Sequence, residues 1–67
     1  MQMFYVVRGD IHPNTVIPFK EKGYEIVSKR DTHFSMKGEE LSESFRNWIV
    51  QDQSLEITTE LPLSQSS

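Results

Sequence analysis

The segment GEELSESFRNWIVQ, residues 38–51, has the clearest periodic pattern in the chain. Glu39 and Glu40 at its start suit the positive end of a helix dipole, and Ser35 just upstream is a candidate N-cap. The large apolar side chains recur at spacings of four, three and one, as along one stripe of a helix: Leu41, Phe45, Trp48 and Ile49. The segment therefore predicts the main helix of the protein.

The residues on either side of this helix predict strands. Residues 54–61 alternate, with Leu55, Ile57, Thr59 and Leu61 on one face and Glu56, Thr58 and Glu60 on the other. Residues 1–7 form an aromatic and β-branched run that is apolar on both faces. Residues 24–29 and 33–36 predict a hairpin that turns at Arg30 and Asp31. Three or four strands are therefore expected.

Two segments lie between the predicted strands. Residues 9–15 contain Gly9-Asp10 and Pro13-Asn14 and predict a loop. Residues 15–22 fit either one helical turn that Pro18 opens and Gly23 ends, or an extended edge segment. The cations and the glycine of FKEKG favour the helical turn.

This order predicts a small α+β fold with two layers, in which one main helix packs on a mostly antiparallel sheet. Residues 1–61 form the single expected domain, and residues 62–67 form an expected disordered tail. The expected core is Phe4, Val6, Ile17, Phe19, Tyr24, Ile26, Phe34, Leu41, Phe45, Trp48, Ile49, Leu55 and Ile57.

Length and composition limit the classes of function. A chain of 67 residues suits one small domain, and the lack of cysteine excludes disulfides and thiolate sites. No apolar run approaches the roughly 20 residues of a membrane span. The N-terminus lacks the features of a secretory signal, so a cytoplasmic protein is expected.

Short motifs give little support for chemistry. Arg8-Gly9-Asp10 matches an adhesion tripeptide, but it follows a strand and fits a simple turn. Asp10 with His12, and Asp31 with His33, lack the spacing of metal or acid–base sites. No activated nucleophile or phosphate loop is visible. We therefore expect no catalytic residue, no metal and no cofactor.

Candidate binding surfaces come from charge and from an uncovered strand face. Residues 1–37 carry six basic and four acidic side chains, a net charge of +2, whereas residues 38–67 carry one basic and six acidic ones, a net charge of −5. The acidic candidates are Glu39, Glu40, Glu43, Glu56 and Glu60. The basic candidates are Lys20, Lys22, Lys29, Arg30 and Lys37. One helix cannot cover both faces of the first strand, so its second face, Met3, Tyr5 and Val7, is a candidate interface.

These observations favour a non-enzymatic protein-binding module, a regulator or inhibitor that docks on a larger protein. A homodimer through the first strand and a phage or mobile-element origin are compatible with so small a chain. The first alternative is a nucleic-acid-binding protein that uses the basic candidates. The second is an enzyme or metal protein that uses His12 and His33.

Overall fold

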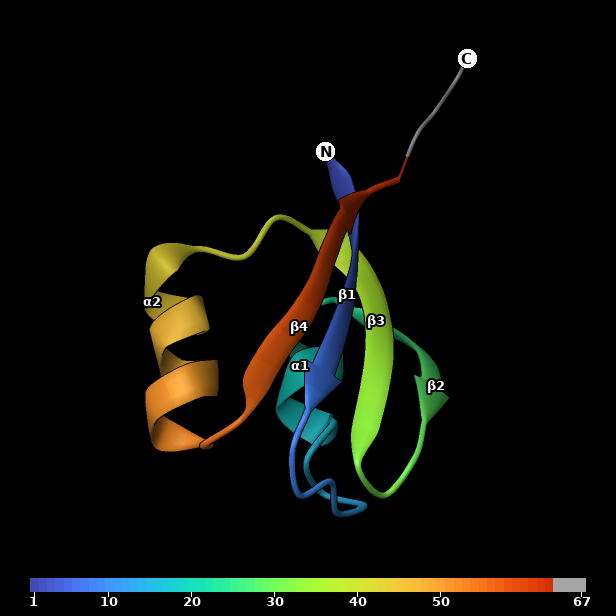
Figure 1. The fold of residues 1–67 in the computed structure, drawn as a ribbon. Helices are drawn as coiled ribbons and strands as arrows, with labels where there is room; N and C mark the ends of the chain where they lie inside the picture. The colour runs from blue at the N-terminus through green and yellow to red at the C-terminus, as the bar shows by residue number, and fades with distance from the viewer. Residues whose placement is uncertain (64–67) are drawn as a thin grey trace.

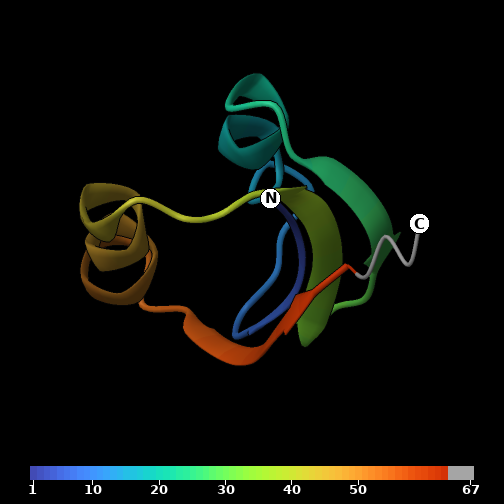
Figure 2. The same ribbon diagram turned by 90° about the horizontal axis from the view of Figure 1, so that it is seen from above.

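The computed structural model describes residues 1–63, which form one antiparallel sheet covered on one face by two short helical segments (Figures 1 and 2). The strands are β1 (Gln2–Arg8), β2 (Glu25–Lys29), β3 (His33–Glu39) and β4 (Glu56–Pro62), in the order β2-β3-β1-β4. The helices are α1 (Ile17–Glu21) and α2 (Glu43–Asn47), and the π-helical turn η1 (Trp48–Asp52) continues α2. The predicted α+β class is confirmed. No helix within residues 1–63 is long and apolar enough to cross a membrane.

The face of β1 that packs against the helices is the opposite of the one predicted. Tyr5 and Val7 are fully buried in the core, whereas Phe4 and Val6 are partly exposed on the open face of the sheet. The reason is parity, because Gln2 and Arg8 lie on the same face as Phe4 and Val6 and need solvent. The prediction that Met3, Tyr5 and Val7 form an uncovered surface is therefore wrong.

The core lies between the sheet and the helical layer. The buried side chains are Tyr5, Val7, Ile11, Val16, Phe19, Tyr24, Phe34, Met36, Leu41, Ile49 and Leu55. Six predicted core residues are among them, and Ile26, Phe45, Trp48 and Ile57 pack against this cluster while partly exposed. Ile17 was also predicted to be buried, but it begins α1 on the solvent side and is 45% exposed.

A β-bulge reverses the alternation of β4. Val7 pairs with Ile57, but Val6 pairs with Thr59, so Thr58 is an extra residue. From Thr59 onward the two faces exchange, and the prediction that Thr59 and Leu61 share the face of Ile57 is wrong. Leu61 is consequently 53% exposed beside Phe4 on the open face.

Strand β3 is longer, and the main helix begins later, than the sequence predicts. Ser35 is a buried strand residue and not a cap. The N-cap is Ser42, whose Oγ accepts a hydrogen bond from the Phe45 N–H at 3.2 Å. Gly38, predicted to begin the helix, pairs with Met3 in the sheet, and the Tyr24 ring lies against it and leaves no room for a Cβ atom.

The segments between and after the predicted strands differ in how well they follow the sequence prediction. Residues 15–22 contain the helical turn α1, with Pro18 in its first turn, and Gly23 follows it with φ of 100°. Gly9 ends the first strand with φ of 154°, and a Cβ there would lie 2.6 Å from Leu55 Cδ2. Pro62, expected in the tail, closes β4, and residues 64–67 lie outside the described residues.

Candidate binding groove

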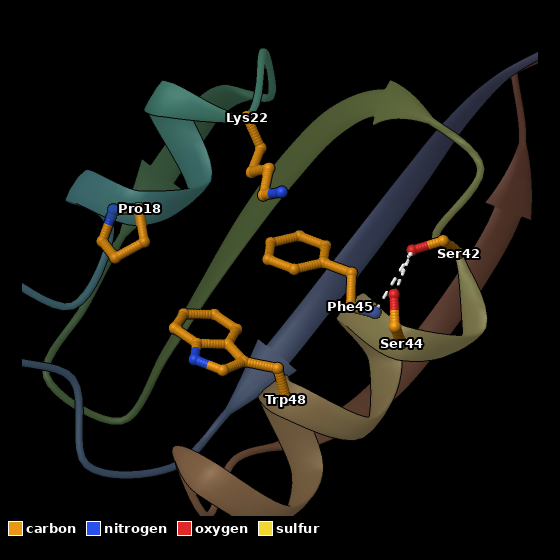
Figure 3. A pocket seen from close by; sticks show the side chains of 6 residues that line it. All are labelled: Pro18, Lys22, Ser42, Ser44, Phe45 and Trp48. Carbon is orange, nitrogen blue, oxygen red and sulfur yellow. Dashed lines mark hydrogen bonds between the residues drawn. The ribbon is translucent and has the colours of Figure 1, made fainter.

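A groove of about 290 Å³ separates α1 from the start of the α2–η1 helix (Figure 3). One wall comes from α1 and the residue after it, and the other comes from the first turns of the main helix. The lining residues are Pro18, Lys22, Ser42, Ser44, Phe45 and Trp48. The groove thus combines apolar rings, two hydroxyl groups and one cation.

Stacked aromatic rings form the floor of the groove. The rings of Phe45 and Trp48, one helical turn apart, lie 5.2 Å apart at an angle of 9°. The fully buried Phe19 supports both rings from below, with centroids at 5.5 and 5.6 Å, and Tyr24 stacks on Phe45 at 5.8 Å. Because both rings are partly exposed yet held by neighbours, they form a preorganised apolar surface.

The polar groups at the groove are only partly used within the chain. Lys22 Nζ lies 5.5 Å from the centre of the Phe45 ring, and no carboxylate within residues 1–63 pairs with it. Ser42 Oγ accepts from the Phe45 N–H, and Ser44 Oγ lies 3.4 Å from Ser42 Oγ. No group in this part of the chain accepts from the Trp48 indole N–H, which reaches solvent. The groove therefore offers a cation to a ligand, and one of its lining residues, Trp48, carries an N–H donor that is free within residues 1–63.

A second hollow, of about 450 Å³, lies at the end of the sheet where β1 stops, and Gly9 is one of its lining residues. Its other lining residues are Arg8, Thr32, Ser54 and Glu56, and it has no aromatic floor. The neighbouring Asp10 carboxylate lies 3.3 Å from His12 Nε2, and both side chains are exposed. The first strand ends at Arg8, as predicted, but the predicted turn at Gly9-Asp10 is only a bend at Gly9, and the hydrogen-bonded turn lies further along, at residues 13–16.

The two Asp/His pairs lie at the same end of the sheet. Arg8 pairs with His33 across the sheet, and the Ile11 N–H donates to the Asp31 carbonyl at 3.0 Å. His33 contacts the Thr32 hydroxyl through Nδ1 at 3.2 Å. Within residues 1–63, no three histidine or carboxylate side chains converge to hold a metal ion.

The acidic candidates do not form one continuous surface. Glu39 pairs with the N-terminal amino group at 3.4 Å and with the Gln2 amide at 3.1 Å. Glu40 and Glu43 are exposed in the β3–α2 connection and the first turn of α2. Glu56 begins β4, at the opposite end of the strand from Glu60. Only Glu40 and Glu43 lie close in sequence to the serines that line the groove.

Glu60 is held by an arginine of the main helix. Both Glu60 oxygens accept from Arg46 at 2.8 and 2.9 Å, because the bulge turns Glu60 toward the helices. The hydrogen bond from Arg46 lowers the pKa of Glu60 and raises the pKa of Arg46.

Burial raises the pKa of Tyr24, and the nearby Tyr5 and Glu39 raise it further.

The basic candidates are distributed over both layers. Lys20 and Lys22 belong to α1 and its end, whereas Lys29 and Arg30 lie at the β2–β3 turn. Lys37 lies opposite Phe4 on the open face of the sheet, and its Nζ is 3.8 Å from a Glu25 oxygen. The fold therefore does not gather these side chains on one surface.

The open face of the sheet is apolar only in small patches. Phe4 lies between Lys37 and Leu61, and Val6 lies between Ser35 and Thr59. Val27 on β2 is 50% exposed. The polar neighbours divide the exposed apolar area, so this face resembles an ordinary solvated sheet more than a docking surface.

No local sequence pattern marks the groove. The sequence predicts Phe45 and Trp48 in the core, Lys22 among the basic candidates, and Pro18 at the start of a helical turn. The available signal was the tryptophan itself, because its size and indole N–H often keep it at a surface. The approach of α1 to these rings depends on tertiary packing.

Comparison with family models, with curated proteins and with solved structures found no match to this chain.

Proposed function

We propose that this protein is a small, non-enzymatic binding module of the cytoplasm that docks on a larger protein through the groove between α1 and α2. Such a module would act as a regulator or inhibitor of its partner by occupying a surface. The single observation that carries the proposal is the stacked and partly exposed pair of Phe45 and Trp48 beside unpaired polar groups.

This pair has the properties of a binding anchor. Large aromatic side chains dominate the energetics of many protein interfaces, most of all where they lie in a preformed hollow. Phe19 and Tyr24 fix the rings from the core side, so little conformational entropy is lost when a partner covers them. Glu40 and Glu43 are exposed and close in sequence to the groove serines, and they would steer a partner whose rim is basic.

A nucleic-acid-binding role has less support. Lys20, Lys22, Lys29, Arg30 and Lys37 lie on different elements and on both sides of the sheet. A protein that tracks phosphates needs its cations along one face.

The test is a substitution that fills the groove without removing a core side chain. Ser44 lines the groove and is exposed, so Ser44→Arg should fold normally and block the groove. Val50 is 46% exposed on the same helix but does not line the groove, so Val50→Arg is the matched control. The partner is first captured with the unaltered protein, purified, and titrated calorimetrically into all three proteins.

The proposal expects binding at least about tenfold weaker for Ser44→Arg, a cost of about 1.4 kcal/mol. The control Val50→Arg should bind as the unaltered protein does. Equal affinity for all three proteins would exclude the groove as the docking surface.

A further inference from the structure

We infer that the ligand of the groove is an extended, proline-containing segment of a partner protein with a carboxylate that reaches Lys22. The inference rests on the proposed function and specifies its ligand. Three features of the groove support it: its short α1 wall, its stacked rings, and two polar groups that have no hydrogen-bond or ion-pair partner within residues 1–63.

The short α1 wall of the groove favours an extended segment over a helix packed between both walls. Helix α1, which forms one wall, has five residues and is therefore about 7.5 Å long at 1.5 Å per residue. A docked helix needs anchors over about two turns, or roughly 11 Å. A polyproline II segment rises about 3.1 Å per residue, so two or three residues cross this wall. The volume of about 290 Å³ is near the lower limit for a small-molecule site and suits a few side chains.

The floor of the groove favours proline. The near-parallel rings of Phe45 and Trp48, with Pro18 on the facing wall, offer apolar surfaces to the compact and rigid pyrrolidine ring of a proline. Prolyl segments are already extended before binding, so they lose little conformational entropy on aromatic-lined surfaces.

The polar groups fix the orientation of the segment. A polyproline II backbone makes no internal hydrogen bonds, so its carbonyl groups can accept from the Trp48 indole N–H. The Lys22 ammonium has no carboxylate partner among residues 1–63 and lies beside an apolar ring. An acidic side chain next to the prolines would form an ion pair with this ammonium group.

The test uses the indole N–H signal of the single tryptophan in nuclear magnetic resonance spectra. The probe is the peptide acetyl-Pro-Pro-Asp-Pro-Pro-amide, and the control probe has alanine at all four proline positions. The inference expects a saturable shift with the prolyl probe at concentrations up to about 5 mM, and binding at least about fivefold weaker with the alanyl probe.

Two variants test the charge. Lys22→Gln should weaken binding of the prolyl probe about threefold or more, whereas Lys20→Gln, on the same helix outside the groove, should not change it. No shift with the prolyl probe, or equal shifts with both probes, would overturn the inference. If Ser44→Arg abolishes partner binding while the prolyl probe fails to bind, the groove remains the docking surface and only the ligand class is wrong.

Discussion

Tyr5 connects the sheet to the helical layer. Its ring is fully buried in β1 and lies edge-on to Tyr24 at 6.4 Å. Its hydroxyl oxygen accepts from the Leu41 N–H at 2.9 Å, which fixes the connection that leads into α2. Tyr5, which the sequence predicts on an uncovered surface, therefore helps to position the start of the main helix. This helix forms one wall of the groove.

Replacing Tyr5 with phenylalanine tests this role. Tyr5→Phe leaves the buried Leu41 N–H without its acceptor, so we expect a loss of about 1–2 kcal/mol in the free energy of unfolding. The control Tyr24→Phe removes a hydroxyl that no group within residues 1–63 binds, and it should change stability by less than about 0.5 kcal/mol. Urea denaturation measures both values, and equal losses would show that the hydrogen bond has no special role.

The Arg46–Glu60 pair gives a defined dependence on pH. The pKa of Glu60 is lowered from its ordinary value of 4.5 in the folded protein. Its stabilisation is therefore complete above the unfolded pKa of 4.5 and is lost as the pH falls through the lower folded pKa. Because the pair is partly exposed, Glu60→Gln should cost only about 0.5 kcal/mol at pH 7.

Denaturation of the unaltered protein and of Glu60→Gln over a range of pH measures this dependence. The difference in stability between the two proteins should shrink below pH 4.5. A difference that stays constant into strong acid would contradict the assignment of the shift to this carboxylate.

The sequence patterns predict whether a segment is a helix or a strand better than they predict which of its faces is buried. Three of the four predicted stripe residues, Phe45, Trp48 and Ile49, lie on the helix, and the α1 turn was also predicted, because local spacing and turn residues determine them. Leu41, the first predicted stripe residue, is buried but precedes the N-cap Ser42. The prediction of the buried face of β1 was wrong because both faces are apolar in the middle of the strand. The polar Gln2 and Arg8 at its ends indicate the side that faces solvent. The bulge at Thr58 was not predictable, since it depends on pairing with β1.

Both edges of the sheet are irregular. Register shifts interrupt β2 between Ile26 and Ser28, and they interrupt the pairing of β4 with β1 at Val6 and Val7. Bulges on edge strands disfavour pairing with a strand of another chain. The bulges therefore disfavour a binding mode in which a partner adds a strand to the sheet, and the helical side is the better candidate for docking.

The contact between Gly38 and Tyr24 sets the spacing of β3 and the helical layer. Gly38→Ala would place a Cβ against three atoms of the Tyr24 ring, which forms part of the aromatic support of Phe45. We expect a loss of about 2–3 kcal/mol in the free energy of unfolding. The control Gly23→Ala meets nothing within 4 Å and should cost only about 1 kcal/mol, from its positive φ. Equal losses of unfolding free energy for the two substitutions would show that the Tyr24 ring does not restrict the side chain at position 38.

The whole molecule is a two-layer domain with one covered face (Figure 2). The fold class was predictable from the order of elements, but the site was not. The sequence predicts Phe45 and Trp48 in the core and Lys22 among the basic candidates, and only the packing of α1 beside α2 brings the three together. Sites formed between segments distant in sequence leave no local spacing for a motif search to find.

The open sheet face should contribute little to function or stability. Leu61→Ser removes an apolar side chain that is already 53% exposed, so we expect a loss below about 1 kcal/mol in the free energy of unfolding. Partner binding measured by calorimetry should also stay unchanged. Weaker binding of Leu61→Ser than of Ser44→Arg would place the docking surface on the sheet.

The most direct measurement compares two side-chain signals in the complex with the captured partner. Trp48 reports on the groove, and the Leu61 methyl groups report on the open face of the sheet. Nuclear magnetic resonance spectra recorded with and without partner should show a shifted Trp48 indole N–H signal and unchanged Leu61 methyl signals. Shifted Leu61 methyl signals with an unchanged Trp48 signal would contradict the assignment of the groove as the docking surface.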